Sequence, residues 1–213
     1  MNDIVQQLAT PGIVPVIAIE NADSAVNLGE ALIAGGLPCA EITFRTAAAK
    51  ESIEKMSTAF PDMLVGAGTV LTVEQAQQAV DAGSKFIVTP NFDPDVVDWC
   101  LANDVPITPG VMTPGEVGMA LKKGLEVVKF FPAEAAGGIP LLKAIAAPFG
   151  GVRFIPTGGI GPKNLADYMA LPMVHACGGS WLVKKQLIAD EQFDTIRKLT
   201  EEAVAIATEI KGA

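Results

Sequence analysis

Lys129 is the one charged residue in a run of apolar and aromatic residues at 127–131, Val-Val-Lys-Phe-Phe. An amine among hydrophobic neighbours loses hydration, which favours its neutral form. A neutral lysine is a nucleophile toward carbonyl carbon and can form a Schiff base. The alternative is a lysine at a strand end that extends its charged head into water. The rest of the chain favours the first interpretation.

A second group of reactive side chains lies at residues 41–46, Glu-Ile-Thr-Phe-Arg-Thr. Side chains of a strand alternate between two faces, so Glu41, Thr43 and Arg45 share the face opposite two apolar residues. If helices cover the apolar face, the polar face points inward with Lys129. Burying a carboxylate and a guanidinium is costly unless they pair with each other or with a ligand. The group is therefore either an internal ion pair or a general base (Glu41) beside a carboxylate-binding guanidinium (Arg45).

Two Gly-Gly pairs follow later apolar runs, and each lies beside a hydroxyl residue. Thr157 precedes Gly158 and Gly159, and the second pair, which ends at Gly179, precedes Ser180. Glycine lets backbone N–H groups approach an anion closely, and a following helix N-terminus adds a favourable dipole. The alternative is a pair of ordinary turns. In (β/α)₈ barrels phosphate is often held after strands seven and eight, so we expect phosphate binding here.

The elements that must position these residues alternate between short apolar runs and amphipathic segments of helix length. We expect strands at residues 13–19, 39–44, 64–68, 86–89, 106–109, 127–131, 154–157 and 175–178. We expect helices at residues 22–34, 47–59, 73–82, 94–102, 114–123, 139–146, 162–170 and 191–210.

Eight strand–helix units of about 25 residues, with continuously apolar strands, indicate a parallel sheet covered by helices. The predicted fold is α/β, a (β/α)₈ TIM barrel that forms a single domain over residues 1–213, with flanking N-terminal and C-terminal helices. An open doubly wound sheet is the main alternative, but no G-x-G-x-x-G follows the first predicted strand.

Three of the predicted helices begin with recognisable capping signals. Asp23 lies at the start of one, Thr72 precedes Gln75 by three residues, and Thr113 precedes Glu116 by three residues. A side-chain oxygen at such a position accepts a hydrogen bond from a backbone N–H of the first turn. These residues are therefore expected to fix where the helices start.

Charge and hydropathy exclude several classes of partner. The net charge is −9 and the longest basic run is a Lys-Lys pair, so we expect no nucleic-acid partner and no anionic membrane surface. The first residues do not form a signal peptide, and no apolar run approaches the ~18 residues that span a bilayer. A cytoplasmic location is expected.

Cysteine and histidine usage argues against a metal centre. Cys39, Cys100 and Cys177 are odd in number, widely spaced and typical of reduced core residues. His175 is the single histidine, it lies in an apolar stretch, and we expect it to be a hydrogen-bonded core residue. One histidine without a cysteine pair favours neither zinc nor another transition metal, so no metal site is predicted.

Together these stretches resemble the 2-keto-3-deoxy-6-phosphogluconate (KDPG) aldolase family, also described as KDPG/KHG aldolases. The resemblance covers nearly the whole chain, and the lysine strand and the Thr-Gly-Gly motif are its most specific parts. It runs through VPVIAI (14–19), EITFRT (41–46), VGAGTVL (65–71), PGVMTPGE (109–116), VKFFPAE (128–134), RFIPTGGI (153–160) and GGSWLV (178–183).

The resemblance implies a class I aldolase on a (β/α)₈ barrel, without metal or cofactor and commonly a homotrimer. By the same resemblance, the site comprises Lys129 (Schiff base), Glu41 (acid/base), Arg45 and Thr69 (substrate carboxylate), Phe131 and Pro90 (substrate pocket), and Thr157, Gly158, Gly159, Gly179 and Ser180 (phosphate). One segment departs from the family pattern, because Thr-Pro-Asn at 89–91 stands where Ser-Pro-Gly is expected. The selectivity for the aldehyde half of the substrate therefore stays open.

The implied reaction is cleavage of 2-dehydro-3-deoxy-6-phosphogluconate, a small-molecule keto-acid sugar phosphate, to pyruvate and glyceraldehyde 3-phosphate, as in the Entner–Doudoroff pathway. The same pocket could cleave 4-hydroxy-2-oxoglutarate to pyruvate and glyoxylate, or the galactose-configured phosphorylated isomer. Two other classes of function remain. A metal-independent sugar-phosphate isomerase or epimerase would use Glu41 as base with Lys129 acting only electrostatically. A non-catalytic anion-binding module would use Arg45 and the Gly-Gly pairs alone.

Overall fold

The computed structural model describes residues 3–212; residues 1, 2 and 213 of the predicted domain lie outside this description. All strand pairs are parallel, in one sheet of order β5-β4-β3-β2-β1-β9 and one of order β6-β7-β8. The strands are β1 (Ile13–Ile17), β2 (Cys39–Thr43), β3 (Leu64–Gly68), β4 (Ile87–Val88), β5 (Ile107–Thr108), β6 (Gly110–Val111), β7 (Val127–Phe130), β8 (Arg153–Pro156) and β9 (Cys177–Gly179).

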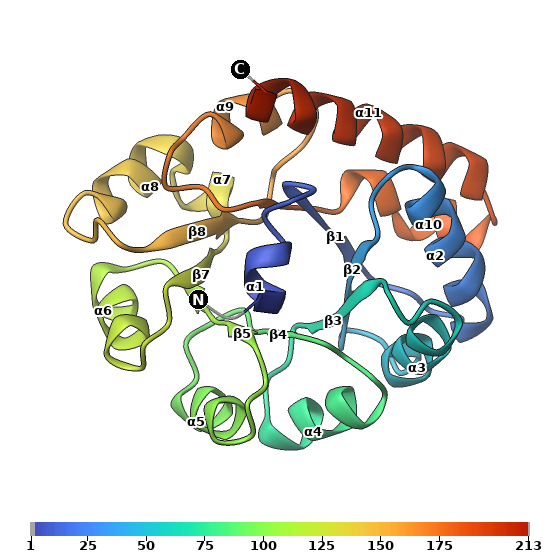
Figure 1. Cartoon of the computed structure of the whole chain (residues 1–213), viewed down its shortest axis with the longest axis horizontal. Coiled ribbons are helices and arrows are strands. Elements are labelled where there is room, and N and C mark those ends of the chain that lie inside the picture. Colours follow the sequence, from blue (N-terminus) through green and yellow to red (C-terminus); the bar gives the residue numbers. More distant parts are fainter. Residues whose placement is uncertain (1–2, 213) are drawn as a thin grey trace.

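Two joints close these sheets into one ring, which Figure 1 shows from one end. At the first, Pro109 separates β5 from β6 because proline has no N–H to donate to the ladder. Its carbonyl still accepts the N–H of Lys129 at 2.9 Å. At the second, Thr157 forms a parallel bridge with Gly178. The predicted (β/α)₈ TIM barrel is confirmed, with its fifth strand divided into β5 and β6.

Helices surround the ring on its outer side (Figure 1). The main ones are α2 (Ala25–Ala34), α3 (Ala49–Ala59), α4 (Val73–Asp81), α5 (Pro94–Ala102), α6 (Pro114–Lys122), α8 (Gly138–Ala146), α9 (Leu165–Met169) and α11 (Phe193–Gly212). Sequence patterning predicts each of them, although α9 is shorter than expected. The first turn of the helix predicted at 22–34 is the 3₁₀ helix η1 (Ala22–Ser24). The pattern did not predict the short elements α7 (Ala133–Ala136), η2 (Trp181–Val183) and α10 (Lys185–Ala189).

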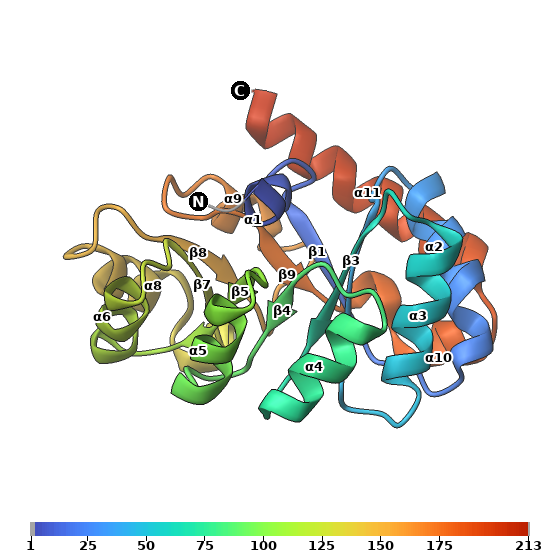
Figure 2. The same cartoon turned by 60° about the horizontal axis from the view of Figure 1, so that its bottom comes forward.

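The helix α1 (Asp3–Gln7) lies across the middle of the ring in Figure 1. It leads directly into β1, so it covers the end of the barrel where the strands begin. In the rotated view of Figure 2, α1 and the C-terminal end of α11 lie at this same end of the molecule. The opposite rim, where the strands end, is left to the loops that carry the predicted site residues.

Two of the three predicted helix caps are confirmed. Thr72 accepts a backbone N–H at the start of α4, and Thr113 forms a complete capping box at α6. The prediction for Asp23 is wrong, because Asn21 accepts the capping hydrogen bond at that end. Asp23 instead forms an ion pair with Lys55 at 2.6 Å, which draws the carboxylate away from the helix end.

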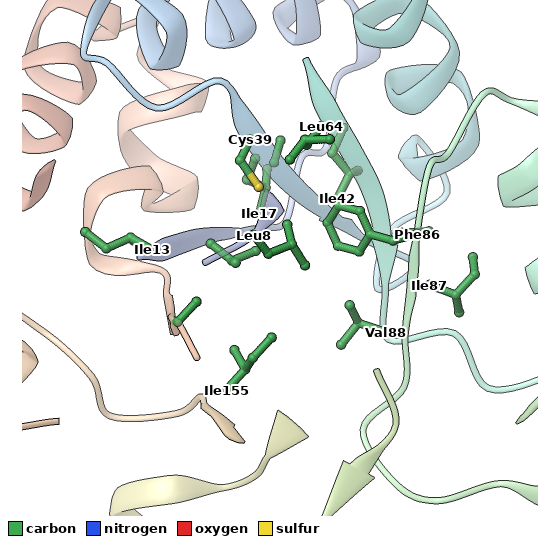
Figure 3. Close-up of a cluster of buried hydrophobic side chains, with 14 of the residues drawn as sticks. Leu8, Ile13, Ile17, Cys39, Ile42, Leu64, Phe86, Ile87, Val88 and Ile155 are labelled. Carbon is green, nitrogen blue, oxygen red and sulfur yellow. The ribbon is translucent and has the colours of Figure 1, made fainter. Parts of the chain in front are cut away.

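The hydrophobic core joins segments that are far apart in the sequence, and Figure 3 shows Leu8, Ile42, Phe86 and Ile155 in one part of it. The ring of Phe86 packs against Gly66 so closely that a Cβ on this glycine would lie 2.3 Å from the ring. Gly66 pairs in register with Glu41, so both face the same side of the sheet. Phe86 therefore fills the barrel interior beside the predicted site.

The histidine that the sequence placed in the core has a structural partner. Nε2 of the half-buried His175 lies 2.8 Å from the carbonyl oxygen of Val5, and a carbonyl only accepts, so this nitrogen donates. The histidine thus ties the segment before β9 to α1. Cys39 and Cys100 are fully buried thiols. Within residues 3–212 there is no helix long and apolar enough to cross a membrane.

Candidate active site

Most of the predicted site residues lie at or just after the C-terminal ends of strands. Parallel strands of a closed barrel bring these ends to one rim, where side chains from distant parts of the sequence meet. The residues that follow strand ends directly or by two positions are Arg45 (β2), Thr69 (β3), Phe131 (β7), Thr157 (β8) and Ser180 (β9).

Lys129 and Glu41 meet inside the barrel. Lys129 Nζ lies 3.3 Å from Glu41 Oε1, and the two residues are only 5% and 3% exposed. They come from β7 and β2, which are not neighbours in the ring, so this contact crosses the interior. The interpretation of Lys129 as a strand-end lysine that reaches water is therefore wrong. The structure brings a buried amine and a buried carboxylate within hydrogen-bonding distance.

Aromatic and backbone groups enclose this amine. The ring centre of the half-buried Phe131 lies 5.3 Å from Lys129 Nζ. In the sheet, Lys129 is paired with Gly110. The carbonyl of Pro90 packs against Gly110, where a Cβ would lie 2.2 Å from the carbonyl oxygen. The structure thus places both predicted pocket residues near the lysine, and Gly110 allows the loop of Pro90 to approach.

Glycine on β3 makes the space for Glu41. A Cβ on Gly68 would lie 2.1 Å from Glu41 Oε1, so any larger residue there would displace the carboxylate. The next residue, Thr69, has φ +55°, a left-handed conformation that is costly for a β-branched side chain. The family resemblance assigned Thr69 to the substrate carboxylate, but the sequence analysis missed Gly68. The sequence did contain a sign of it, because a Gly-x-Gly pattern inside a strand often marks a place where another group packs closely against the backbone.

Arg45 does not pair with Glu41, which corrects the ion-pair interpretation drawn from the sequence. No acidic side chain of the described residues lies within ion-pair distance of the Arg45 guanidinium. Its Nε donates to Thr43 Oγ1 at 3.0 Å, and Thr43 in turn donates to the carbonyl of Ile17 at 2.6 Å. Arg45 is exposed at the rim. Its charge is therefore available to an anionic ligand.

One cleft at the rim brings Arg45 together with the residues around the Gly-Gly pairs, whereas Lys129, Glu41 and Thr69 do not line it. Arg45 lies at one side of it and the Gly-Gly segment of β8 at the other. Its lining consists of Val16, Arg45, Phe131, Thr157, Gly158, Gly159, Ile160, Gly178 and Ser180. Six of these nine residues are in the predicted site, whereas Val16, Ile160 and Gly178 were missed.

Gly179 does not line this cleft. A Cβ on Gly179 would lie 1.8 Å from the ring of Trp181, so the glycine is explained by the packing of this tryptophan. Gly178 is the glycine that faces Thr157, whose Oγ1 would lie 2.2 Å from a Cβ on it. Gly178 is the residue paired with Thr157, and paired residues of parallel strands face the same side of the sheet. Strand alternation therefore distinguishes Gly178 from Gly179.

The segment 157–160, called the glycine loop below, turns its carbonyl oxygens away from the cleft. Gly158 and Gly159 have φ values of +100° and +82°, which favour glycine strongly. The carbonyls of residues 157, 158 and 159 accept hydrogen bonds from Ala133 N (2.8 Å), Glu134 N (3.0 Å) and Asn164 Nδ2 (3.1 Å), respectively. No described group accepts the N–H of Gly159 or Ile160. These two donors are therefore available at the cleft.

A tyrosine–glutamate hydrogen bond braces this loop from behind. Tyr168 on α9 is fully buried, and its hydroxyl donates to Glu134 Oε1 at 2.5 Å. Burial, and then the bond to Glu134, raise the pKa of the Tyr168 hydroxyl well above its ordinary value, so it keeps its proton. The Glu134 side chain held in this way packs against Gly159, where a Cβ would lie 2.6 Å from it. The bond thus helps to fix the glycine loop.

Among the residues that the structure describes, no group of three or more His, Cys, Asp or Glu side chains is arranged to hold a metal ion. The site instead contains a buried amine, a buried carboxylate, a guanidinium without an acidic partner and backbone N–H groups without an acceptor. Such a set can form a covalent imine, transfer a proton, and bind an anion at each end of one ligand.

Comparison with known proteins identifies a family. The family model described as KDPG and KHG aldolase matches residues 4–199. The chain is 48% identical to the 2-dehydro-3-deoxy-phosphogluconate aldolase of Treponema pallidum, over 97% of this chain and 98% of the relative.

Two solved structures are closely similar. The first is the KDPG aldolase of Legionella pneumophila with pyruvate captured as a covalent carbinolamine (TM-score 0.91, 39% identity, 95% of this chain and 98% of that one). The second is the aldolase of Zymomonas mobilis with 3-phosphoglycerate (TM-score 0.87, 40% identity, 96% of this chain and 95% of that one).

Proposed function

The chain belongs to the KDPG and KHG aldolase family, and we propose that it uses Lys129 as its imine-forming lysine. It is a carbon–carbon lyase that cleaves 2-dehydro-3-deoxy-6-phosphogluconate to pyruvate and glyceraldehyde 3-phosphate. The observation that carries the assignment of Lys129 is its contact with Glu41, two buried groups 3.3 Å apart inside the barrel. A buried charged pair without a function is costly to retain.

The first half of the reaction builds an electron sink on the enzyme. Glu41 takes a proton from the Lys129 ammonium, and the neutral amine attacks the C2 ketone of the substrate. Glu41 returns this proton to the hydroxyl of the carbinolamine, which leaves as water and gives a protonated imine. Arg45 and Thr69 bind the adjacent carboxylate, and Phe131 packs along the keto acid. No acidic side chain of the described residues pairs with the Arg45 guanidinium, so its charge is available to this carboxylate.

The second half breaks the carbon–carbon bond. Glu41, directly or through a water molecule, removes the proton of the C4 hydroxyl. The C3–C4 electron pair moves into the imine, so glyceraldehyde 3-phosphate leaves and an enamine of pyruvate remains. Protonation at C3 and hydrolysis of the imine release pyruvate and free Lys129. General acid–base help of this kind is typically worth ~10²–10⁴-fold in rate.

The phosphate end of the substrate binds at the glycine loop and the loop after β9. The free N–H groups of Gly159 and Ile160 support this assignment, as do the hydroxyls of Thr157 and Ser180 at the cleft. Gly158 contributes by allowing the loop conformation. Gly178 replaces Gly179 as the second glycine of this end. A substrate without phosphate, such as 4-hydroxy-2-oxoglutarate, would use the same imine end but would gain no binding energy from the glycine loop.

The proposed assembly is a homotrimer in the cytoplasm. Two large apolar side chains on loops that follow β3 and β6, Leu71 and Met112, are 50% and 42% exposed and would suit a subunit interface. The buried thiols of Cys39 and Cys100 suit a reducing compartment. Light scattering coupled to gel filtration tests the trimer, and a monomer at micromolar concentration would refute it.

Reductive trapping tests the proposed role of Lys129. Borohydride added with pyruvate should reduce the imine and add the mass of a reduced pyruvate adduct, which peptide mapping should locate at Lys129. Lys143, an exposed lysine on α8, provides a matched control: the Lys143→Met variant should trap pyruvate as the unmodified chain does. Absence of the adduct would reject the imine mechanism and favour an isomerase or a binding module.

A further inference from the structure

Thr43 connects Arg45 to the barrel wall although it takes no part in bond making. It is fully buried on β2, between the residues proposed as proton carrier and as carboxylate ligand. We propose that Thr43 is a positioning residue that holds the Arg45 guanidinium ready for the substrate carboxylate. This inference rests on the proposed role of Arg45.

The directions of the hydrogen bonds follow from the chemistry of the groups. A guanidinium only donates and a carbonyl only accepts. Arg45 Nε must therefore donate to Thr43 Oγ1 (3.0 Å), and the Thr43 hydroxyl must direct its own proton to the carbonyl of Ile17 (2.6 Å). The hydroxyl is thereby fixed, with its lone pair toward Arg45. Linked bonds of this kind polarise and strengthen one another.

The surroundings leave the hydroxyl no other partner and little freedom. On β3, Thr43 is paired in register with Gly68, which has no side chain to compete for it. Thr46 donates to the carbonyl of Ile19 at 2.5 Å. The turn that carries Arg45 is therefore attached on both of its sides, by Thr43 and by Thr46, to β1 and the residues that follow it. A β-branched side chain is also restricted about χ1. The anchor for Arg45 is therefore rigid.

Engaging Nε directs the other edge of the guanidinium to the ligand. The two terminal nitrogens of Arg45 remain free, and they form the fork that matches a carboxylate. A long, exposed arginine otherwise loses side-chain freedom when it binds, and that loss weakens affinity. Because Thr43 already restrains Arg45, part of this loss of side-chain freedom occurs before the substrate binds.

This arrangement predicts an effect on binding rather than on chemistry. The substrate carboxylate keeps its charge from the bound keto acid through the transition state. A contact to it therefore stabilises the bound substrate and the transition state equally. Thr43→Val should raise KM for the keto acid by about tenfold, the cost of one charge-assisted hydrogen bond, with kcat changed less than about twofold. Thr43→Ser keeps the hydroxyl and should retain the original KM.

The experiment compares these variants with Thr200→Val as a matched control. Thr200 is also fully buried and donates to a carbonyl, that of Ile196, but on α11 away from the cleft. Kinetics are measured with the keto-acid substrate, and imine trapping with pyruvate and with its uncharged amide, pyruvamide. Thr43→Val should weaken trapping of pyruvate and leave that of pyruvamide unchanged. Thr200→Val should alter neither.

Arg45→Gln separates this inference from the proposed function. A KM unchanged by Arg45→Gln would refute Arg45 as the carboxylate ligand. If Arg45→Gln raises KM but Thr43→Val does not, the positioning role of Thr43 alone is refuted. It is also refuted if Thr43→Val raises KM further when Arg45 is already glutamine. Should Thr43→Val fail to fold, Arg45→Lys, which keeps the charge but lacks Nε, must raise KM for the inference to stand.

Discussion

The two ends of the proposed site use different parts of the chain to bind the charged groups of the substrate. At the imine end (Glu41, Thr43, Arg45 and Lys129), strands hold side chains whose reactivity depends on burial and on their partners. At the glycine loop, the donors are backbone N–H groups whose availability depends on positive φ angles. Bond making is thus separated from phosphate binding. Substitutions of Lys129 or Glu41 should change turnover, whereas substitutions in the glycine loop should change affinity for phosphorylated substrates.

The largest effect is expected for Lys129→Arg. A guanidinium stays protonated and cannot form an imine, so kcat should fall by on the order of 10⁴-fold or more. Steady-state cleavage of the phosphorylated keto acid measures this, and borohydride with pyruvate should then trap nothing. Retained turnover in this variant would mean that the imine end does not carry the chemistry.

Glu41→Gln should have the second largest effect. It removes the base and not the nucleophile, so kcat should fall by about 10²–10⁴-fold while pyruvate can still be trapped on Lys129. Unchanged cleavage kinetics would exclude Glu41 from proton transfer. The neutral amide also leaves Lys129 without its buried counter-charge, so the melting temperature should be recorded with the kinetics.

Gly159→Ala tests the other end of the comparison. Alanine at φ +82° is strained, and its Cβ would lie 2.6 Å from Glu134, so the loop must shift. KM for the phosphorylated substrate should rise by about tenfold, with trapping of pyruvate unaltered. Gly161→Ala is the matched control, because a Cβ there meets nothing within 4 Å. A similar loss of pyruvate trapping would show that the two ends are not independent.

The smallest effect concerns two buried thiols, Cys39 on β2 below Glu41 and Cys100 on α5. Burial, and then the negative charge of Glu41, raise the pKa of the Cys39 thiol; burial raises that of Cys100 to about 12. The thiolate is the nucleophile, so neither thiol should be alkylated by iodoacetamide at pH 8 in the native protein, whereas both should react after denaturation. Rapid native labelling of Cys39 would mean that the interior below Glu41 is wet.

Much of the imine end could be predicted because its signals are local. Alternation along residues 41–45 and 127–131 assigns Glu41, Arg45 and Lys129 to one interior. The structure agrees for Glu41 and Lys129, but Arg45 follows the end of β2 and is exposed at the rim. The choice of partner could not be predicted. Glu41 pairs with Lys129 and not with Arg45, since that choice depends on which strands face each other across the closed ring.

The glycine loop was predictable in composition and not in detail. Two Gly-Gly pairs marked the region, but only the bridge between Thr157 and Gly178 shows that Gly178 faces the cleft and Gly179 faces Trp181. The roles of Asn164 and Glu134 in holding the carbonyls were also missed. Their contacts join segments that no periodic pattern connects.

The amino-acid sequence alone determines the alternation of strands and helices, two of the three helix caps and the face on which each reactive side chain lies. These follow from the repeat of the backbone and from hydrogen bonds between residues a few positions apart. Only the tertiary structure decides the Lys129–Glu41 contact, the free fork of Arg45 and the available N–H groups of the glycine loop. Each depends on register and ring closure, which bring together groups far apart along the chain.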